Sequence, residues 1–152
     1  MIDVIEVARR FVFLSYGKNK YSLTLPKLQY LLYLTQGWSF AWDGVPAFSE
    51  EFEAGARGPF SGRVAEVFGK YGRDEIPETE GSDDISDEAI GETIDAIWRE
   101  FGRKPAFALS ELVCGQEPWL HAYERRLPIS VDDVKKYFLF AYGSRSVSNG
   151  ND

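Results

Sequence analysis

The sequence predicts a mainly α, single compact domain of about six or seven helices around a buried central helix. A small β-hairpin or extended segment is expected near residues 47–57. Apolar residues recur at helical spacing along most of the chain, and residues 27–38, KLQYLLYLTQGW, are apolar on two sides. A chain of 152 residues, 44% of them hydrophobic, has enough apolar material for one buried core.

The first helix is expected over residues 3–15 and the central helix over residues 27–43. Pro26 suits the first turn of the central helix, and Gly44 gives a stop signal after it. The apolar run inside it covers about 15 residues, whereas a membrane span needs roughly 20. This segment therefore indicates a core helix and not a membrane helix.

Three residues of the central helix raise separate questions. Gln29 and Gln36 lie seven positions apart on one side. A lone polar stripe is typical of a solvated face, so we expect solvent there; the alternative is a hydrogen bond to a loop or partner. Gly37 indicates that another backbone comes close.

After the central helix, Gly and Pro break the helical pattern, which favours the hairpin. Gly58-Pro59 is expected to start the next helix, which ends at Gly72. Residues 74–88 hold eight acidic residues and predict a solvated loop, with Ser86 capping the following helix.

The C-terminal third predicts further helices. One ends at Gly102, two short ones follow around ALSELVC and PWLHAYERR, and the last is capped by Ser130 with Asp133 at its third position. We expect one domain over residues 1–142 and a disordered tail over residues 143–152.

Composition excludes several classes of function. A net charge of −7 provides no basic footprint, so no nucleic acid is expected as a partner. A single cysteine excludes an internal disulfide and a thiolate zinc cage, which favours the cytoplasm. Charged residues near the N-terminus, such as Arg9 and Arg10, do not fit a signal peptide.

No constellation predicts catalysis. Cys114 and His121 are seven residues apart and could form a dyad, but a buried thiol and a half-exposed imidazole are the preferred interpretation. Acidic residues in the 83–88 stretch lack the spacing of a calcium loop. We therefore expect no enzyme activity, no metal and no cofactor.

The central stretch resembles the signature helix of the Panacea domain, the SocA-like antitoxin or phage-associated protein family. The matching positions are Lys27, Leu28, Gln29, Leu31, Leu32, Tyr33, Gln36, Gly37 and Trp38. Further matches are Glu53-Ala54, Gly58-Pro59-Phe60, Lys70-Tyr71-Gly72, Gln116 to Trp119, Ile129-Ser130 and KKYF at 135–138. The resemblance covers about residues 3–140.

The sequence departs from the family pattern at three positions. Gly55 stands where the family usually has Trp, Arg57 where it has Tyr, and Cys114 where its motif has His. The first two departures change a surface that could touch a partner, and the third weakens any chemistry based on that histidine.

The resemblance implies an antitoxin that neutralises a cognate protein toxin encoded beside it, by direct binding or by delivering it to a cellular protease. One alternative is a small enzyme or metabolite-binding protein with a cleft near Gly58-Pro59 and Pro118-Trp119. A DNA-binding autorepressor is the other, although no basic recognition helix is visible.

The expected contact surface lies in the 47–60 segment, because loops on a rigid scaffold tend to carry recognition. Its candidate residues are Glu53, Gly55, Arg57, Gly58, Pro59, Phe60 and, from the later motif, Trp119. The acidic 74–88 segment is a second candidate through long-range attraction to a basic toxin. The signature residues, together with Pro118, are expected to be mainly structural.

Overall fold

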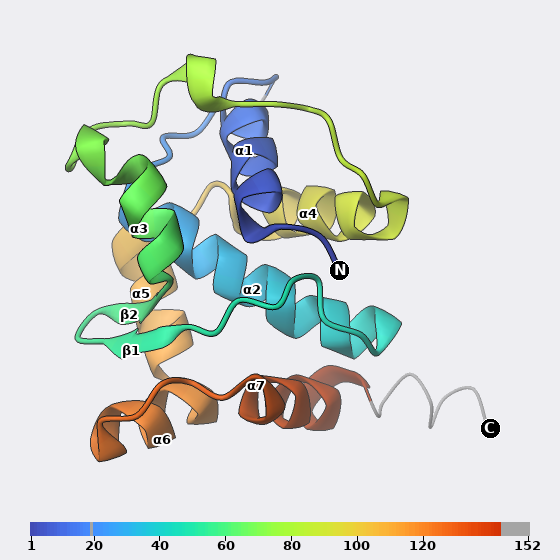
Figure 1. The fold of residues 1–152 in the computed structure, drawn as a ribbon, viewed down its shortest axis with the longest axis vertical. Helices are drawn as coiled ribbons and strands as arrows, with labels where there is room; N and C mark the ends of the chain where they lie inside the picture. The colour runs from blue at the N-terminus through green and yellow to red at the C-terminus, as the bar shows by residue number, and fades with distance from the viewer. Residues whose placement is uncertain (19, 144–152) are drawn as a thin grey trace.

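A computed structural model of the chain describes residues 1–18 and 20–143 (Figure 1). Its elements are α1 (Val4–Ser15), α2 (Leu25–Asp43), β1 (Glu53–Gly55), β2 (Gly58–Phe60), α3 (Gly62–Phe68), α4 (Glu88–Phe101), α5 (Ala106–Cys114), α6 (Glu117–Arg125) and α7 (Val131–Phe138). Two short 3-10 turns, Gly69–Tyr71 and Glu78–Glu80, and a π-helical end, Leu139–Gly143, complete it.

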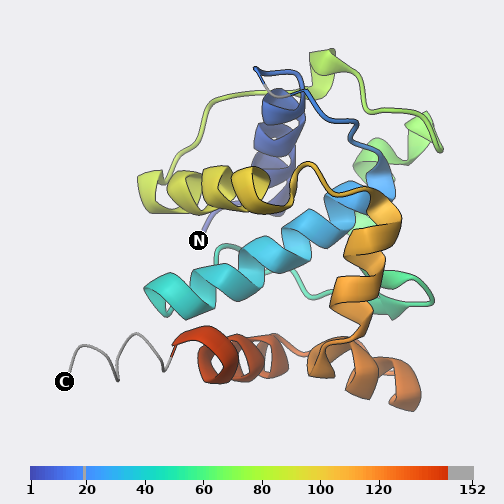
Figure 2. The ribbon, with the colours of Figure 1, turned by 180° about the vertical axis from the view of Figure 1, so that it is seen from behind.

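Helix α2 runs through the middle of the molecule, as predicted. Helices α1 and α4 cover one side of it, and α7 covers the opposite side (Figures 1 and 2). Helix α5 and the two-stranded sheet pack near the end where α2 begins. Leu28, Leu31 and Leu32 have 0% exposure, so the prediction of a buried central helix is confirmed.

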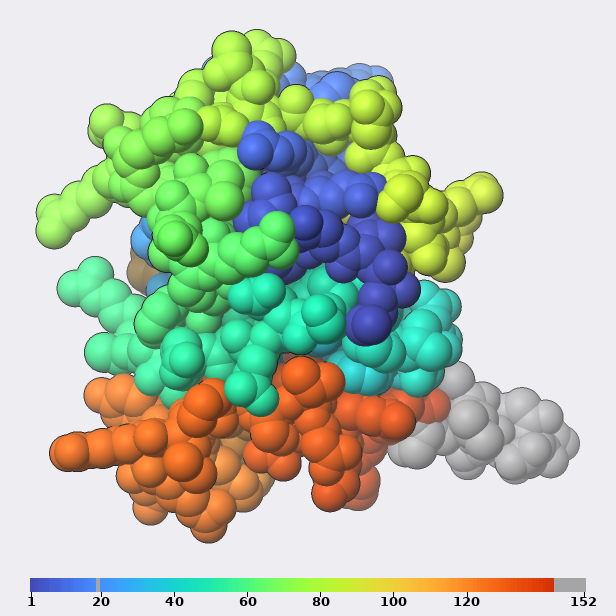
Figure 3. Space-filling view, in the orientation of Figure 1, coloured from blue at the N-terminus to red at the C-terminus, as the bar shows by residue number. Residues whose placement is uncertain are grey.

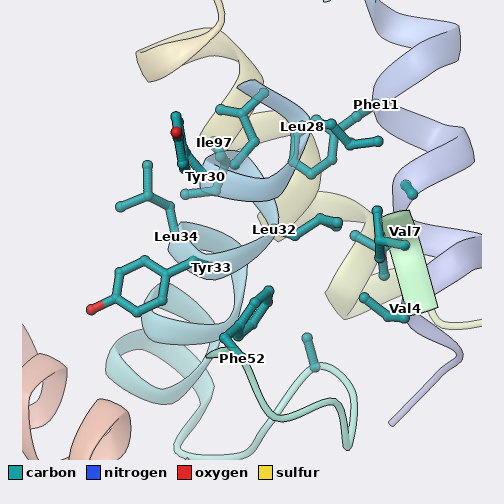
Figure 4. Close-up of a cluster of buried hydrophobic side chains, with 14 of the residues drawn as sticks. Val4, Val7, Phe11, Leu28, Tyr30, Leu32, Tyr33, Leu34, Phe52 and Ile97 are labelled. Carbon is teal, nitrogen blue, oxygen red and sulfur yellow. The ribbon is translucent and has the colours of Figure 1, made fainter. Parts of the chain in front are cut away.

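Both apolar sides of α2 contribute to the core (Figure 4). Leu28 lies beside Phe11 of α1, while Tyr33 projects from another side of α2. The ring of Tyr33 packs edge-on against Phe52 and Phe138, with centroids 6.1 and 6.0 Å away. The helix therefore joins the layer of α1 and α4 to the layer of α7.

Local capping fixes most helix starts. The Ser130 side chain accepts from the amide of Asp133, as the sequence predicts. The predicted cap at Ser86 is wrong. Asp87 caps α4 by accepting from Ile90, while the Ser86 hydroxyl donates to the Glu6 carboxylate at 3.0 Å.

The β element overlaps its predicted range, near 47–57, and ends three residues beyond it. The hairpin occupies residues 53–60, and Gly58-Pro59 belongs to β2 instead of starting a helix. The following helix begins after Ser61, whose hydroxyl accepts from the amide of Val64. A side-chain cap was available at Ser61, whereas Gly58 has a φ of +149°, which is incompatible with a helix.

Gly37 is close-packed for a different reason from the predicted one. A Cβ on Gly37 would lie 2.3 Å from the Cε1 atom of Phe138, so a side-chain ring and not a backbone approaches it. Glycine at this position lets the aromatic ring of α7 sit directly on α2.

The acidic 74–88 segment is a loop with a 3-10 turn, and it is fastened to α1. Arg9 pairs with Glu80 at 2.6 Å, and the Arg10 guanidinium donates to the Asp83 carbonyl at 2.9 Å. Ile76 is fully buried and donates its amide to the carbonyl of Leu23. The exposed carboxylates of residues 74–88 therefore lie on a backbone that is held in place at several points.

Gly143 is buried at the end of the π-helical turn, and the rest of the predicted tail, residues 144–152, lies outside the described residues. In residues 1–18 and 20–143, no helix is both long enough and apolar enough to cross a bilayer.

Candidate functional site

The candidate contact residues gather around the β-hairpin, and we refer to them as the hairpin surface. Its members are Glu53, Gly55, Arg57, Gly58, Pro59, Phe60 and Trp119. Strands β1 and β2 pair in antiparallel register, with Glu53 opposite Phe60 and Gly55 opposite Gly58. Ala56 and Arg57 form the two-residue turn at the tip.

Two glutamines of α2 hold the segment that contains the hairpin. Gln29 donates its amide to the Ser61 carbonyl at 3.0 Å and accepts from the Ser61 amide at 2.8 Å. Gln36 donates to the Phe48 carbonyl and accepts from the Ala47 amide, both at 2.8 Å.

Both glutamines are buried, so the expected solvated stripe is wrong and its alternative, a hydrogen bond to a loop, is correct. Each side-chain amide satisfies both a donor and an acceptor of the buried backbone. Together they fasten the two ends of residues 47–61 to one helix.

The tip of the hairpin rests on α2 and α5. A Cβ on Gly58 would lie 2.5 Å from Cε1 of Tyr30, so glycine allows the strand to pass directly over the tyrosine ring. Burial raises the pKa of the Tyr30 phenol above its ordinary value. From α5, the Ser110 hydroxyl donates to the Arg57 carbonyl. These contacts fix the turn that presents the Arg57 side chain.

Helix α6 holds the hairpin through Trp119. The indole Nε1 donates to the Gly55 carbonyl at 2.8 Å, which brings together two residues 64 positions apart. A Cβ on Gly55 would lie 2.9 Å from Cδ1 of Phe60, so a larger side chain would not fit here without a shift. Glycine at this position thus accompanies a tightly packed pair of strands.

Members of the hairpin surface differ in accessibility. Glu53, Arg57 and Phe60 are exposed, and Gly55 is half-buried. Gly58, Pro59 and Trp119 are buried in the free chain. The side chains of the first three are thus accessible on the surface, whereas the last three support the hairpin.

Two hollows flank the hairpin. One, of about 440 Å³, lies on the β2 side and includes Pro26, Tyr30, Arg57 and Phe60 in its lining. The other, of about 670 Å³, lies between β1 and α6, and Trp119 is among the residues that line it.

A single cleft formed by Gly58-Pro59 and Pro118-Trp119 is not observed. Gly58 and Pro59 line the hollow on the β2 side, and Trp119 lines the one between β1 and α6. Pro118 lines a third hollow between α6 and α7. The hairpin separates the two motifs because it lies between α2 and α6.

The signature residues hold the interior together. Burial lowers the pKa of Lys27 to about 8, and its Nζ donates to the carbonyls of Ser22 and Gly102 at 2.9 and 2.5 Å.

Two aromatic signature residues also lie in the interior or at its edge. The Tyr33 hydroxyl donates to Gln116 Oε1 at 2.8 Å, and burial raises the pKa of the Tyr33 phenol well above its ordinary value. Trp38 is half-buried and packs on Trp42 and Tyr142.

Cys114 and His121 have separate surroundings. Cys114 is half-buried, and burial raises the pKa of its thiol. The exposed His121 pairs through Nε2 with Glu117 at 3.0 Å. Within the described ranges, no cluster of three His, Cys, Asp or Glu side chains could hold a metal ion.

Sequence reasoning missed the role of Tyr30, Ser61 and Ser110 in positioning the site, and it named Gln116 only as a match to the family motif. Ser61 carried a detectable signal, since a serine before an amphipathic stretch favours a helix cap. Ser110 and Gln116 form hydrogen bonds with residues 53 and 83 positions away, and no local pattern in the sequence predicts such contacts.

Comparison with known families gives one match. Residues 28–120 match the family described as antitoxin SocA-like, Panacea domain. The matched range is more than half of the chain and runs from α2 through the hairpin to α6. Neither the curated proteins nor the solved structures compared with the chain gave a match.

Proposed function

The chain belongs to the family of SocA-like antitoxins with a Panacea domain, and we propose that it neutralises a protein toxin by binding it stoichiometrically through the hairpin surface. The observation that carries this proposal is the way the hairpin is held. Its backbone is bonded to α5 through Ser110 and to α6 through Trp119, and Gln29 of α2 bonds to Ser61, the residue that directly follows it.

Such support favours binding because a preorganised surface loses little conformational freedom when a partner docks. The exposed groups at the tip suit recognition. Arg57 projects a cation from an otherwise acidic protein, and Phe60 provides an aromatic ring beside the 440 Å³ hollow. Arginine and aromatic residues are enriched among the residues that dominate protein interfaces.

Charge contributes a second, longer-ranged component. The net charge of −7 and the exposed carboxylates of residues 74–88 attract a basic toxin. Because Arg9 and Arg10 hold this segment against α1, its charges keep a fixed position relative to the rest of the surface. We assign this segment to steering and the hairpin surface to the docked contact.

The test uses the protein whose gene lies beside that of this chain, produced with and without the chain in a bacterial host. We expect growth to be rescued only when the chain reaches about equimolar amounts. Light scattering on the purified mixture should show a complex of defined stoichiometry.

Arg57→Glu is the critical variant, and Arg103→Glu is its control. Both replace an exposed arginine by glutamate, but Arg103 lies on the α4–α5 connection and outside the hairpin surface. Arg57→Glu should weaken the complex at least about tenfold, as loss of a good interface arginine commonly does. The control should bind as wild type does.

Three outcomes contradict parts of the proposal. Rescue at strongly substoichiometric amounts, in a host without the relevant proteases, would indicate turnover. Rescue that disappears in that host would indicate delivery of the toxin to a protease. Equal binding by both arginine variants would remove the hairpin surface as the interface.

A further inference from the structure

The backbone of Ala54 leaves an open position on the outer edge of β1. Ala54 lies opposite Pro59, which has no N–H, and the neighbouring pair, Gly55 and Gly58, closes the two-residue turn. Opposite residues in an antiparallel pair alternate between bonded and non-bonded pairs, so Ala54 and Pro59 form a non-bonded pair. The N–H and C=O groups of Ala54 therefore point away from β2.

Outside the β1–β2 pairing, neither backbone group of Ala54 bonds to any described residue. Two residues earlier, the same edge is already occupied. Ile129 donates its amide to the Phe52 carbonyl at 2.8 Å in an isolated antiparallel bridge. This bridge shows that the edge accepts an extended chain.

The intramolecular pairing does not continue to Ala54. The next residue in register would be Leu127, but its amide donates to the Ala122 carbonyl at 2.9 Å and closes the end of α6. In Figure 3, the orange residues that join α6 to α7 lie directly below the teal segment that leads into β1. An unpaired edge is thus left where the two segments diverge.

A hollow of about 670 Å³ adjoins this edge, and we call it the edge groove. Ala54, Leu120, Tyr123 and Leu127 are among its lining residues. Leu120, Tyr123 and Leu127 are 44%, 47% and 56% exposed, a high exposure for large apolar side chains that lie together. Tyr123 is stacked on Trp119 with centroids 4.5 Å apart, which gives the groove a flat aromatic wall.

We propose that the edge groove takes one extended segment of the partner protein, which adds a short strand to β1 by pairing with Ala54. A segment with an extended backbone can hydrogen-bond to both the N–H and the C=O group on one strand edge. Alternate side chains of that segment then enter adjoining pockets. One apolar side chain of the segment lies on Leu120, Tyr123 and Leu127. The inference rests on the proposed toxin binding and identifies the part of the toxin that is held.

The charged residues of the edge groove indicate which side chains the bound segment carries. The carboxylates of Glu53 and Glu124 line the edge groove together with the single guanidinium of Arg126, and the whole chain carries −7. A segment with basic residues beside its apolar anchor is therefore complementary to this surface.

The test compares Ala54→Pro with Ala54→Val in the full chain. Proline removes the outward N–H without removing a β1–β2 bond, and it is tolerated on edge strands. Valine keeps the N–H and favours a strand. The probe is a displayed library of linear 12-residue peptides, which does not depend on knowing the toxin.

We expect wild type and Ala54→Val to enrich peptides that combine an apolar residue with basic neighbours. Ala54→Pro should lower their affinity roughly tenfold, as expected for the loss of a buried backbone bond. Leu127→Glu is the second variant, since it blocks the apolar wall while leaving the strand unchanged. It should abolish the same enrichment, and circular dichroism should show both variants folded.

The proposal is overturned if no peptide is enriched on wild type over both Ala54→Pro and Leu127→Glu. It is also overturned if wild type self-associates and Ala54→Pro does not, because the occupant is then a second copy of the chain. Binding of the neighbouring gene product is measured separately with the same variants. Toxin binding that is equal in all of them removes the edge groove but retains the antitoxin function, whereas absent binding to wild type removes the function itself.

Discussion

Gln29 and Ser61 exchange two hydrogen bonds, 3.0 and 2.8 Å long, between the side-chain amide of α2 and the backbone that follows the hairpin. The Ser61 hydroxyl also caps α3 and donates to Glu50 at 2.8 Å. One buried glutamine thus fixes the point where strand β2 ends and helix α3 begins. Gln36 has the same relationship to Ala47 and Phe48, at the other end of the segment.

Replacing Gln36 with Leu should lower the free energy of unfolding by about 1–3 kcal/mol, because it leaves the Ala47 N–H and Phe48 C=O buried without partners. Urea unfolding followed by tryptophan fluorescence measures the change. Gln29→Leu should show a loss of similar size. A cost below about 0.5 kcal/mol for both variants would mean that water replaces the lost bonds.

Truncation of Leu32 to Ala should lower the free energy of unfolding by about 2–5 kcal/mol, since the side chain is fully buried in the centre of α2. Leu112→Ala is the matched control on α5, where the side chain is 39% exposed. Its effect should be clearly smaller in the same thermal or urea experiment. Equal effects would contradict the central position of α2.

Gly58→Ala should destabilise the hairpin by about 1–3 kcal/mol, because the φ of +149° is unfavourable for alanine and the new Cβ would meet Tyr30. Gly62→Ala is the control, since nothing lies within 4 Å of a Cβ at that position. The control should be neutral or slightly stabilising in helix α3. Amide exchange in residues 53–60 should rise in the first variant only.

Lys27 should make stability rise with pH in the alkaline range. Its pKa is lowered to about 8 by burial, compared with 10.5 for an ordinary lysine. Between these values the unfolded chain binds more protons than the folded chain, so the free energy of unfolding increases with pH.

The measurement is the difference in unfolding free energy between wild type and Lys27→Met from pH 7.5 to 9.5. The difference curve removes contributions from groups that both proteins share. It should slope upward in favour of wild type above about pH 8. A flat difference curve would show that the pair of carbonyl acceptors keeps the ammonium charged in the fold.

Changing Cys114 to Ser together with His121 to Ala should leave toxin neutralisation at the level set by stability alone. The thiol has a raised pKa, so little thiolate is present near neutral pH, and His121 faces Glu117. Rescue is titrated against the amount of chain, with unfolding measured in parallel. Loss of rescue in a folded double variant would reveal chemistry at this pair.

Helix positions followed from the sequence where the signals were local. Caps such as Ser130 and stop signals such as Gly44 act within a few residues, and the two-sided apolar pattern of residues 27–38 sufficed to predict a buried helix. The hairpin was expected from breaks in periodicity alone, so its predicted range, near 47–57, only overlaps the observed residues 53–60. In the structure, β2 passes over Tyr30 at Gly58, and Tyr30 is 28 positions away along the chain.

Part of the candidate site could likewise be predicted from the sequence, and part could not. The family-like motifs pointed to the hairpin residues and to Trp119, and the tertiary structure joins Trp119 to Gly55 through one hydrogen bond. The sequence contained no sign of the open edge at Ala54. That feature arises because Leu127 turns to close α6 while Ile129 pairs with Phe52.

A mainly α domain, its family and the burial of α2 could be predicted from the amino-acid order, because periodicity, capping and residue order are properties of neighbouring positions. The roles of Gln29 and Gln36 became clear from the packing of distant segments. A polar stripe has the same periodicity whether it faces water or a buried backbone. The outcome depends on segments that pack against the helix, here the backbone of Ala47, Phe48 and Ser61.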